Sequence, residues 1–188
     1  MSGADAYAGH DLDVLSDLAR YRHWIMAAFR PYLRGRGVEF GAGIGTMSAD
    51  LLAHVEHLDL VEPSPNLVAR LEARFAGEAR ITILPGRLEE RIAELADGSY
   101  HSAVLVNVLE HIEDDGAALT QLRRILDGDG HLLVFVPAMA FLMSPFDRAI
   151  GHFRRYHKGA LVARLEAAGF AVARARYFDI LGMIPWWL

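Results

Sequence analysis

The chain has 188 residues, a length that suits one domain with a substantial buried core. Its hydrophobic fraction of 53% argues against disorder, and the absence of cysteine excludes disulfides, zinc-thiolate sites and thiol nucleophiles. The net charge of −5 disfavours binding to nucleic acid through a basic face.

No long apolar segment marks the sequence. Residues 1–20 carry charges and lack the apolar core of a signal peptide. The longest apolar run, residues 132–143, contains Pro137 and is too short to span a bilayer. We therefore expect a cytoplasmic protein with no membrane span.

Residues 1–36 are predicted to form an N-terminal helical cap, and residues 37–188 the main domain. After a loose leader at residues 1–10, apolar residues recur at helical spacing from Asp11 to Leu33. This spacing indicates two helices that are broken near Arg20 and end close to Pro31. Such helices either pack on the main domain or cover its ligand.

Residues 37–63 are predicted to form a strand, a glycine-rich turn, a helix and a second strand. The turn has glycine at positions 41, 43 and 45, and the second strand ends in Glu62. Glycine permits positive φ and lets a ligand approach backbone N–H groups at a helix N-terminus. An acidic residue about 20 positions beyond the first glycine is where such βαβ units meet ribose hydroxyls. The unit therefore predicts a nucleoside-binding site.

The glycine turn and the acidic residue before it resemble motif I of the class I S-adenosylmethionine-dependent methyltransferases. The residues that carry this resemblance are Glu39, Gly41, Gly43 and Gly45. An NAD-dependent oxidoreductase is a weaker alternative, because Thr46 stands where a dinucleotide fingerprint needs a small apolar residue.

The resemblance implies roles for individual residues in binding S-adenosyl-L-methionine. Glu39 would serve the amino-acid end of the cofactor, often through water, and the turn with Ala42 would lie against the methionine moiety. Glu62, followed by Pro63, would occupy the family's ribose-binding place.

The next predicted elements are a helix over residues 63–75 and a strand over residues 80–84. In the resembling family the loop after this strand holds the adenine, usually with an acidic residue after its glycine. Arg87 occupies that place here, so the adenine contact is expected from Arg87, from the backbone of Leu88 or from Glu89. A short helix is predicted over residues 88–95.

Residues 102–107 form an almost continuous apolar run, as expected for a parallel strand buried on both faces. The sequence Asn-Val-Leu-Glu-His-Ile that follows from Asn107 resembles the family's fourth motif. This implies that Asn107 and Val108 lie beside the methionine end of the cofactor. Glu110 is expected to anchor the turn by accepting hydrogen bonds from backbone N–H groups.

His111 is a candidate general base, because histidine titrates near neutral pH. Its alternative role is to cap or pack the turn after the strand. No metal site is expected, since Asp114 and Asp115 lack the spaced carboxylate partners of a divalent site.

The remaining pattern predicts a helix at residues 116–126, a turn at 127–130, a strand at 131–136, a helix at 157–168 and a sixth strand at 170–178. Strands that alternate with helices predict an α/β fold with a doubly wound, mostly parallel sheet, Rossmann-like as in the resembling methyltransferases. Residues 180–188 leave no room for that family's seventh strand. We expect either a truncated domain or one completed by a partner, including a homo-oligomer formed through the apolar C-terminus.

Residues 137–156 form the least regular segment and mix methionine and aromatic groups with a few polar anchors. His152 and Tyr156 are candidates for a catalytic base or for orienting the acceptor. Arg154 and Arg155 either pair with an anionic acceptor or form a salt bridge with Asp147.

Together these patterns predict methyl transfer from S-adenosylmethionine to a small-molecule acceptor, at oxygen or nitrogen in preference to carbon. The alternative is a non-catalytic, methyltransferase-like partner or regulator that binds the cofactor, because no acceptor base is clearly identified.

Overall fold

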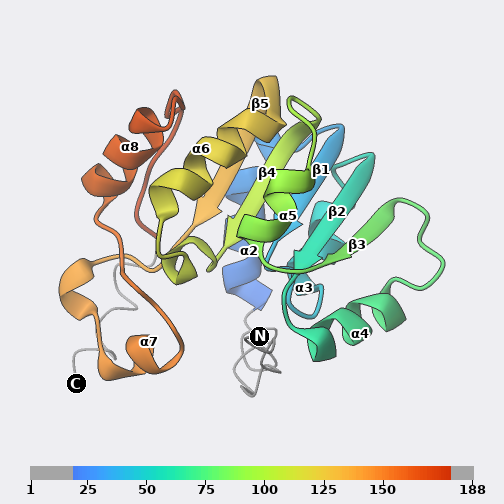
Figure 1. The fold of residues 1–188 in the computed structure, drawn as a ribbon, viewed down its shortest axis with the longest axis horizontal. Helices are drawn as coiled ribbons and strands as arrows, with labels where there is room; N and C mark the ends of the chain where they lie inside the picture. Colours follow the sequence, from blue (N-terminus) through green and yellow to red (C-terminus); the bar gives the residue numbers. More distant parts are fainter. Residues whose placement is uncertain (1–18, 179–188) are drawn as a thin grey trace. The chain divides into compact units, whose positions relative to one another are not determined.

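The computed structural model describes residues 19–178 (Figure 1). The elements in the first part of the chain are α2 (Ala19–Phe29), a 3₁₀ turn (Arg30–Tyr32), β1 (Arg36–Phe40), α3 (Thr46–Leu51), β2 (His57–Glu62), α4 (Pro65–Arg74), β3 (Ile81–Pro85), α5 (Leu88–Glu94) and β4 (Tyr100–Val106). Those in the second part are a 3₁₀ turn (Leu109–His111), α6 (Asp115–Ile125), β5 (Leu126–Phe135), a 3₁₀ turn (Ala140–Leu142), α7 (Pro145–Ala149) and α8 (Lys158–Ala167).

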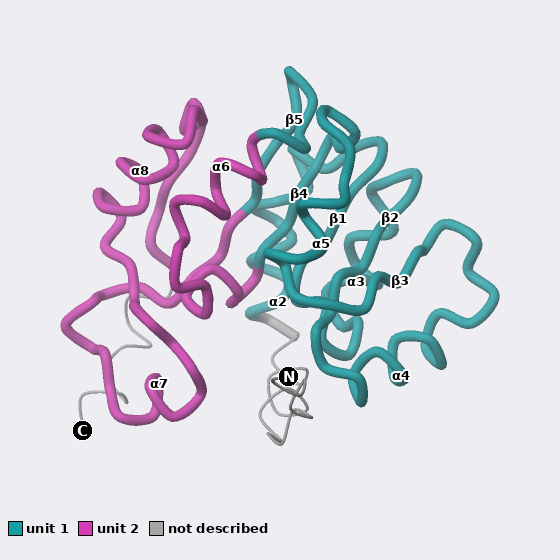
Figure 2. The backbone as a smooth tube through the Cα atoms, in the orientation of Figure 1, with its two compact units in different colours: residues 1–105, 124–133 teal, residues 106–123, 134–188 magenta. Residues whose placement is uncertain are grey.

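The chain divides into two compact units, shown in different colours in Figure 2. Among the described residues, unit 1 takes residues 19–105 and 124–133, and unit 2 takes residues 106–123 and 134–178. Each boundary between the units falls inside a regular element, namely β4, α6 or β5.

The sheet has five strands in the order β3-β2-β1-β4-β5. The pairs β1–β2, β1–β4 and β2–β3 are parallel, and Phe40 on β1 lies opposite Val61 on β2 and Leu105 on β4. The strand order reverses between β1 and β4, and ligands of open α/β sheets bind at such a switch point, beyond the carboxyl ends of the strands. The glycine-rich turn follows the carboxyl end of β1. The predicted fold class is therefore confirmed.

The central strands β1, β2 and β4 are mostly buried because both faces of this part of the sheet are covered. Val38, Phe40, Leu60 and Leu105 are fully buried, which explains why these strands are nearly continuous apolar runs. Helix α4 contacts β2 and β3, and α3 contacts α2 and β2.

Unit 1 also contains a hydrogen-bond network around one buried carboxylate, that of Asp59. Asp59 on β2 is buried and accepts hydrogen bonds from the Nη2 atom of Arg36 at 2.7 Å and from the hydroxyl of Tyr100. The Nε2 atom of His57 lies 3.1 Å from its other carboxylate oxygen. These contacts join β1, β2 and β4 through one carboxylate.

Unit 2 is organised around Asp115, the first residue of α6. This buried carboxylate accepts hydrogen bonds from the hydroxyl of Tyr156 at 2.8 Å and from Arg164 of α8 at 2.7 Å, and it pairs with Arg154 at 2.8 Å. An acidic side chain in the first turn also complements the helix dipole. Asp115 therefore links α6, α8 and the segment before α8.

Two predicted elements differ from the structure. Strand β5 begins at Leu126, so the turn predicted at residues 127–130 lies within the strand. The strand predicted at residues 170–178 is wrong, since no strand is assigned there. Alternation of apolar residues does not supply a hydrogen-bonded neighbour, and this segment makes side-chain contacts instead, such as the packing of Phe178 on Phe135.

Some predictions concern parts of the chain outside the described residues. These are the first of the two N-terminal helices, the end of the chain after residue 178, and the oligomer contact through that end. The second N-terminal helix is present as α2, which is followed by a 3₁₀ turn across Pro31.

Candidate functional site

The glycine-rich turn between β1 and α3 is held against the end of β2. The N–H groups of Gly41 and Ala42 donate to the carbonyl of Val61 at 2.8 and 3.2 Å. Gly43 and Gly45 have φ values of 57° and 77°, in the left-handed region that favours glycine. The sequence therefore forms this turn because glycine stands where a side chain would be strained.

Glu62 fixes the conformation of this turn. Its buried carboxylate accepts hydrogen bonds from the N–H groups of Gly43 at 2.8 Å and Ser64 at 2.9 Å, one on each oxygen. A carboxylate has about four lone-pair sites, so both oxygens keep capacity for a further donor such as a ribose hydroxyl. Pro63, next in the chain, is exposed.

Glu39 lies buried at the end of β1. One of its oxygens accepts a hydrogen bond of 2.5 Å from the hydroxyl of Ser48 on α3. Burial raises the pKa of Glu39 to about 8, against the opposing effect of the Ser48 hydrogen bond. A cation placed beside this carboxyl would favour its ionised form. Ser48 was not predicted as a site residue, and its position two residues into α3 carries no distinctive sequence signal.

The predicted adenine residues lie at the start of α5. Arg87 is exposed at the N-cap, and its N–H donates to the carboxylate of Glu90 at 3.2 Å. The side chain of Leu88 is buried, which leaves only its backbone for a ligand. The adenine contact stays a prediction.

Asn107 and Val108 follow β4 and belong to unit 2. Asn107 has a φ of 53°, and its N–H donates to the carbonyl of Phe135 at 2.8 Å. Asparagine is among the few residues other than glycine that adopt this left-handed conformation, and such positions cluster at functional sites. The contacts of Asn107 and Val108 with the cofactor stay predictions.

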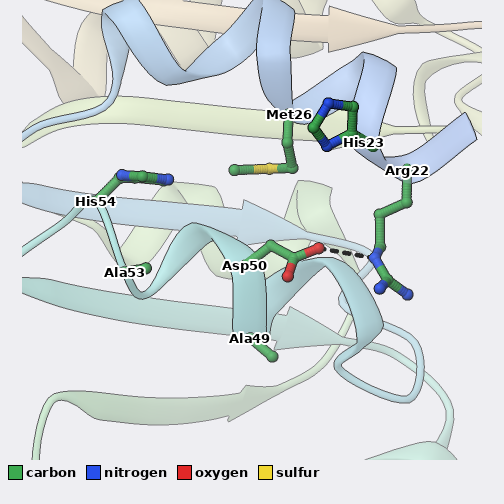
Figure 3. A pocket seen from close by; sticks show the side chains of 7 residues that line it. All are labelled: Arg22, His23, Met26, Ala49, Asp50, Ala53 and His54. Carbon is green, nitrogen blue, oxygen red and sulfur yellow. Dashed lines mark ion pairs between the residues drawn. The ribbon is translucent and has the colours of Figure 1, made fainter. Parts of the chain in front are cut away.

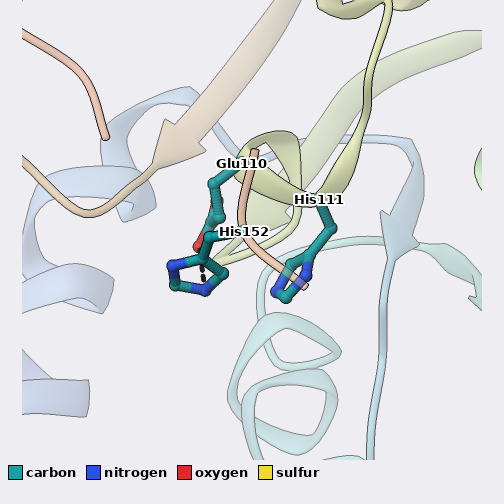
Figure 4. A group of neighbouring side chains, drawn as sticks. All are labelled: Glu110, His111 and His152. Atoms are coloured by element: carbon teal, nitrogen blue, oxygen red, sulfur yellow. Dashed lines mark ion pairs between the residues drawn. The ribbon is translucent and has the colours of Figure 1, made fainter. Parts of the chain in front are cut away.

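The structure brings the two candidate catalytic histidines together with Glu110 (Figure 4). One nitrogen or oxygen atom from each of Glu110, His111 and His152 lies within 4.8 Å of the others. The imidazole rings of His111 and His152 meet edge to face with their centroids 4.6 Å apart, and the Nε2 atom of His152 lies 3.9 Å from Oε1 of Glu110.

The anchoring role predicted for Glu110 is not seen in full: the backbone N–H of Glu110 itself favours the ionised carboxylate, but among the described residues no contact has the geometry of a hydrogen bond. Its side chain is fully buried, yet within residues 19–178 neither carboxylate oxygen has a hydrogen-bond partner. Burial accordingly raises the pKa of Glu110 to about 8. The sequence pattern indicated a motif at this position but not the direction of the side chain, which extends toward His152.

Asp147, which was not predicted as a site residue, fixes the position of His152 in this cluster. The side chain is buried and accepts hydrogen bonds from the N–H and hydroxyl of Ser144, each at 2.8 Å, and from Arg155 at 2.8 and 3.0 Å. Burial by itself would raise the pKa of Asp147, but the hydrogen bonds from Arg155 and Ser144 outweigh it and lower this pKa to about 2. The salt bridge expected between the arginine pair and Asp147 is confirmed for Arg155.

Asp147 also determines which nitrogen of His152 carries a proton. The Nδ1 atom of His152 lies 3.0 Å from Oδ1 of Asp147. Because an ionised carboxylate only accepts hydrogen bonds, Nδ1 is the protonated nitrogen, and Nε2 faces Glu110 with its lone pair when the ring is neutral. Burial lowers the pKa of His152 and outweighs the opposing effect of Asp147, which favours this neutral ring. The capping box formed by Ser144 and Asp147 was the available sequence signal for this residue.

Tyr156 occupies a structural position. It is buried, its hydroxyl donates to Asp115 at 2.8 Å, and burial followed by the nearby Asp115 raises the pKa of the hydroxyl. Such a hydroxyl ionises with difficulty, which does not suit a general base. The catalytic role of Tyr156 stays a prediction that this geometry disfavours.

A separate pocket lies in unit 1 between α2 and α3 (Figure 3). It has a volume of about 340 Å³, and its lining residues are Arg22, His23, Met26, Ala49, Asp50, Ala53 and His54. An ion pair of 2.7 Å between Arg22 and Asp50 crosses it. The predicted cofactor and catalytic residues are not among those that line it.

Within the part of the chain that the structure describes, no helix has the length and apolar composition needed to cross a membrane.

The fold and the turn define a nucleotide-binding α/β domain, because a parallel sheet in this strand order carries a glycine turn after β1 and an acidic residue at the end of β2. The model of a family described as a methyltransferase domain matches residues 13–175. The chain belongs to this family, and the resemblance found in its motifs is confirmed.

One curated relative and two solved structures illustrate what this chain is similar to. A protein of Mycobacterium tuberculosis named a probable S-adenosylmethionine-dependent methyltransferase is 29% identical over 164 residues, which cover 85% of this chain and 58% of that protein. The chain thus spans little more than half the length of this relative. Among solved structures, an S-adenosylmethionine-dependent methyltransferase from Mesorhizobium loti matches with a TM-score of 0.75 at 19% identity, over 90% of both chains. The YcgJ protein from Bacillus subtilis matches with a TM-score of 0.69 at 18% identity, over 79% of this chain and 69% of that one. At these identities the two structures show a shared fold.

Proposed function

We propose that this chain transfers a methyl group from S-adenosyl-L-methionine to a small-molecule acceptor, at oxygen or nitrogen. The observation that carries the proposal is membership of the methyltransferase-domain family together with the intact arrangement of Glu39, the glycine turn and Glu62. Family membership makes S-adenosyl-L-methionine the cofactor.

The residues of unit 1 fit the chemical groups of this cofactor. Glu62 has acceptor capacity for two ribose hydroxyls while it holds Gly43. Glu39 is a buried carboxyl with a raised pKa, so a cationic amino group near it would be stabilised by its ionisation. Gly43 and Gly45 have positive φ values, which favour glycine over residues with a side chain. Because glycine has no side chain, a ligand can approach the backbone of the turn.

When bound, the cofactor supplies a methyl group that is activated by its attachment to a positively charged sulfur. The protein's task is to align this group with the acceptor and to exclude water. Alignment of two reactants is worth about 7–11 kcal/mol at best. A side chain need only accept the proton that the acceptor loses, for which His111 and His152 are the proposed groups. Partial desolvation and then the neighbouring His152 lower the pKa of His111, which favours its neutral, proton-accepting form.

The acceptor is proposed to be small and partly apolar. The net charge of −5 disfavours a nucleic-acid acceptor. The segment that contains His152 exposes the large apolar side chains Phe141, Phe146, Ile150 and Phe153. Aromatic groups beside a few polar anchors are typical of sites for small molecules. A cytoplasmic location and the absence of a nucleic-acid partner remain expectations.

Calorimetric titration with S-adenosylmethionine, S-adenosylhomocysteine and NAD tests the cofactor assignment. We expect micromolar binding of the first two and none of NAD. Gly43→Val should abolish binding, because valine is strained at the φ of 57°. Gly77→Val is the matched control, since Gly77 has a similar φ of 84° and an added Cβ there would meet no atom within 4 Å. Binding of NAD in place of the other two would overturn the proposal.

An acceptor screen then separates an enzyme from a non-catalytic cofactor-binding protein. Formation of S-adenosylhomocysteine should depend on a hydroxyl or amine acceptor and should fall in His111→Gln and His152→Gln with cofactor affinity retained. Cofactor binding without turnover on any hydroxyl or amine class would favour the regulatory alternative.

A further inference from the structure

Three side chains of unit 2 converge from two separate segments of the chain. Glu110 and His111 lie in the 3₁₀ turn after β4, and His152 lies in the segment between α7 and α8. Their ligand atoms gather within 4.8 Å of one another (Figure 4), and methyl transfer as described above gives Glu110 no role.

Glu110 is the strongest reason to seek a ligand here. The carboxyl of Glu110 is fully buried, and among the described residues neither of its oxygens has a partner with hydrogen-bond geometry, so its ionised form is costly without a cation. The Nε2 atom of His152, at 3.9 Å from Oε1, is too distant for a hydrogen bond. A cation between the two side chains would satisfy the carboxylate.

Asp147 prepares His152 for such a cation. Histidines that bind metals almost always donate their other ring N–H to a carboxylate or carbonyl, which fixes the ring and its tautomer. Asp147 accepts from Nδ1 at 3.0 Å, so the Nε2 lone pair faces Glu110. Asp147 is itself fixed by Ser144 and Arg155.

We propose that Glu110, His111 and His152 bind one divalent transition-metal ion, for which Zn²⁺ is the suitable probe. Two imidazoles and one carboxylate form a three-ligand set that suits zinc and leaves further positions for water or an oxygen ligand. Ligand atoms of a tetrahedral zinc site lie roughly 3.4 Å apart, given bonds of about 2.1 Å. The present separations of 3.9 to 4.8 Å therefore close by side-chain rotations, the largest of them at the exposed His111. The proposal departs from the expectation of no metal, which considered only the neighbouring aspartates.

A bound metal would change how the two histidines act. As ligands they would not be free bases, and the metal would lower the pKa of a bound hydroxyl or water instead. The proposal nevertheless stands apart from methyl transfer, because metal binding is measured without cofactor or acceptor.

The test is titration of the purified, chelator-treated chain with Zn²⁺ in competition with a chromophoric chelator. We expect one equivalent to bind with a submicromolar dissociation constant, as zinc held by three protein ligands does. Glu110→Gln, His111→Gln and His152→Gln should each weaken binding by about 100-fold or more, since ligands matter at least as much as the groups that orient them. His54→Gln is the matched control, because His54 belongs to unit 1 and is not a member of the cluster, and the zinc affinity of this variant should equal that of the wild type.

Three further measurements keep the proposal falsifiable if a variant fails to fold. Glu110→Gln keeps the shape of the buried side chain and cannot ionise, so the metal-free variant should melt at or above the temperature of the metal-free wild type while losing zinc binding. Asp147→Asn should weaken binding about 10-fold, as loss of an orienting group does, and should alter the visible spectrum of the Co²⁺-loaded chain. X-ray absorption of the zinc-loaded wild type should show two imidazoles in the first shell.

Unchanged zinc affinity in Glu110→Gln and His152→Gln would overturn the proposal, as would no binding below about 10 μM or a first shell without imidazole. In that case Glu110 is a protonated, neutral carboxyl that faces His152.

Discussion

At the scale of single residues, Glu62 combines two tasks that can be separated experimentally. It holds the glycine turn through Gly43 and Ser64, and it is the proposed acceptor for ribose hydroxyls. Replacement by glutamine keeps the shape but leaves one acceptor oxygen and places an amide N–H₂ against a backbone donor.

We therefore expect Glu62→Gln to weaken S-adenosylhomocysteine binding by about 10-fold to 100-fold, the range for a lost hydrogen bond to a charged group. Calorimetry measures this change, and Glu56→Gln, at an exposed position before β2, should leave affinity unaltered. Equal affinity of Glu62→Gln and the wild type would show that the ribose is held elsewhere.

Glu39 should make stability depend on pH. Its pKa in the folded protein is about 8, above the ordinary value of 4.5, so between these values the folded state holds a proton that the unfolded state releases. The stabilisation due to Glu39 is complete below pH 4.5 and is lost as pH rises toward 8. The slope has an upper limit of about 1.4 kcal/mol per pH unit.

The measurement compares urea unfolding of the wild type and Glu39→Gln at pH 5, 6.5 and 8. Relative to the wild type, the variant should become more stable as pH rises, because glutamine does not ionise. A constant difference for Glu39→Gln would mean that Glu39 is ionised in the folded state throughout.

At the scale of elements, the entry into α3 depends on Gly45. Its φ is 77°, and an added Cβ would lie 2.6 Å from a ring carbon of Phe75 and 2.9 Å from Leu71 at the end of α4. Gly77 has a similar φ of 84° but no atom within 4 Å of the added Cβ. The two positions thus share backbone strain and differ in packing.

We expect Gly77→Ala to cost about 1 kcal/mol from backbone strain alone, and Gly45→Ala to cost about 2–4 kcal/mol because overpacking adds to it. Urea unfolding measures both values. Equal losses would mean that Phe75 moves aside without cost, so that packing between the turn and α4 does not select glycine.

Some elements of the fold and of the candidate site could be predicted from the sequence, and others could not. Strands β1, β2 and β4 were predictable because burial on both faces produces nearly continuous apolar runs such as residues 102–107. Glu39, the glycines and Glu62 were predictable because their spacing follows from one local unit of strand, turn and helix. The meeting of Glu110 with His152 was not, because it joins segments about 40 residues apart through the path of an irregular segment. Asp147 is marked in the sequence only as a helix cap.

At the scale of the whole molecule, the two units share the chain in an interleaved way. Residues 124–133 return to unit 1 after residues 106–123 have contributed to unit 2. The crossings lie within β4, α6 and β5, not in loops. An element that spans a boundary cannot unfold in one unit without losing hydrogen bonds in the other, so the chain should unfold as one cooperative structure.

Two buried carboxylates, one in each unit, allow the cooperativity of unfolding to be tested. Asp59 accepts hydrogen bonds from Arg36 and Tyr100 in unit 1. Asp115 accepts hydrogen bonds from Arg164 and Tyr156 in unit 2. Replacing either with asparagine should cost about 2 kcal/mol or more, because several charge-assisted hydrogen bonds are weakened.

Native-state hydrogen exchange reads the free energy of opening in both units at once. We expect each variant to lower the protection of the slowest amides in β2 and in α6 by the same amount. Asp114→Asn, at an exposed cap position where asparagine serves equally well, should change neither. A loss confined to the unit that carries the substitution would show two units that open independently, with the shared elements fraying at their boundaries.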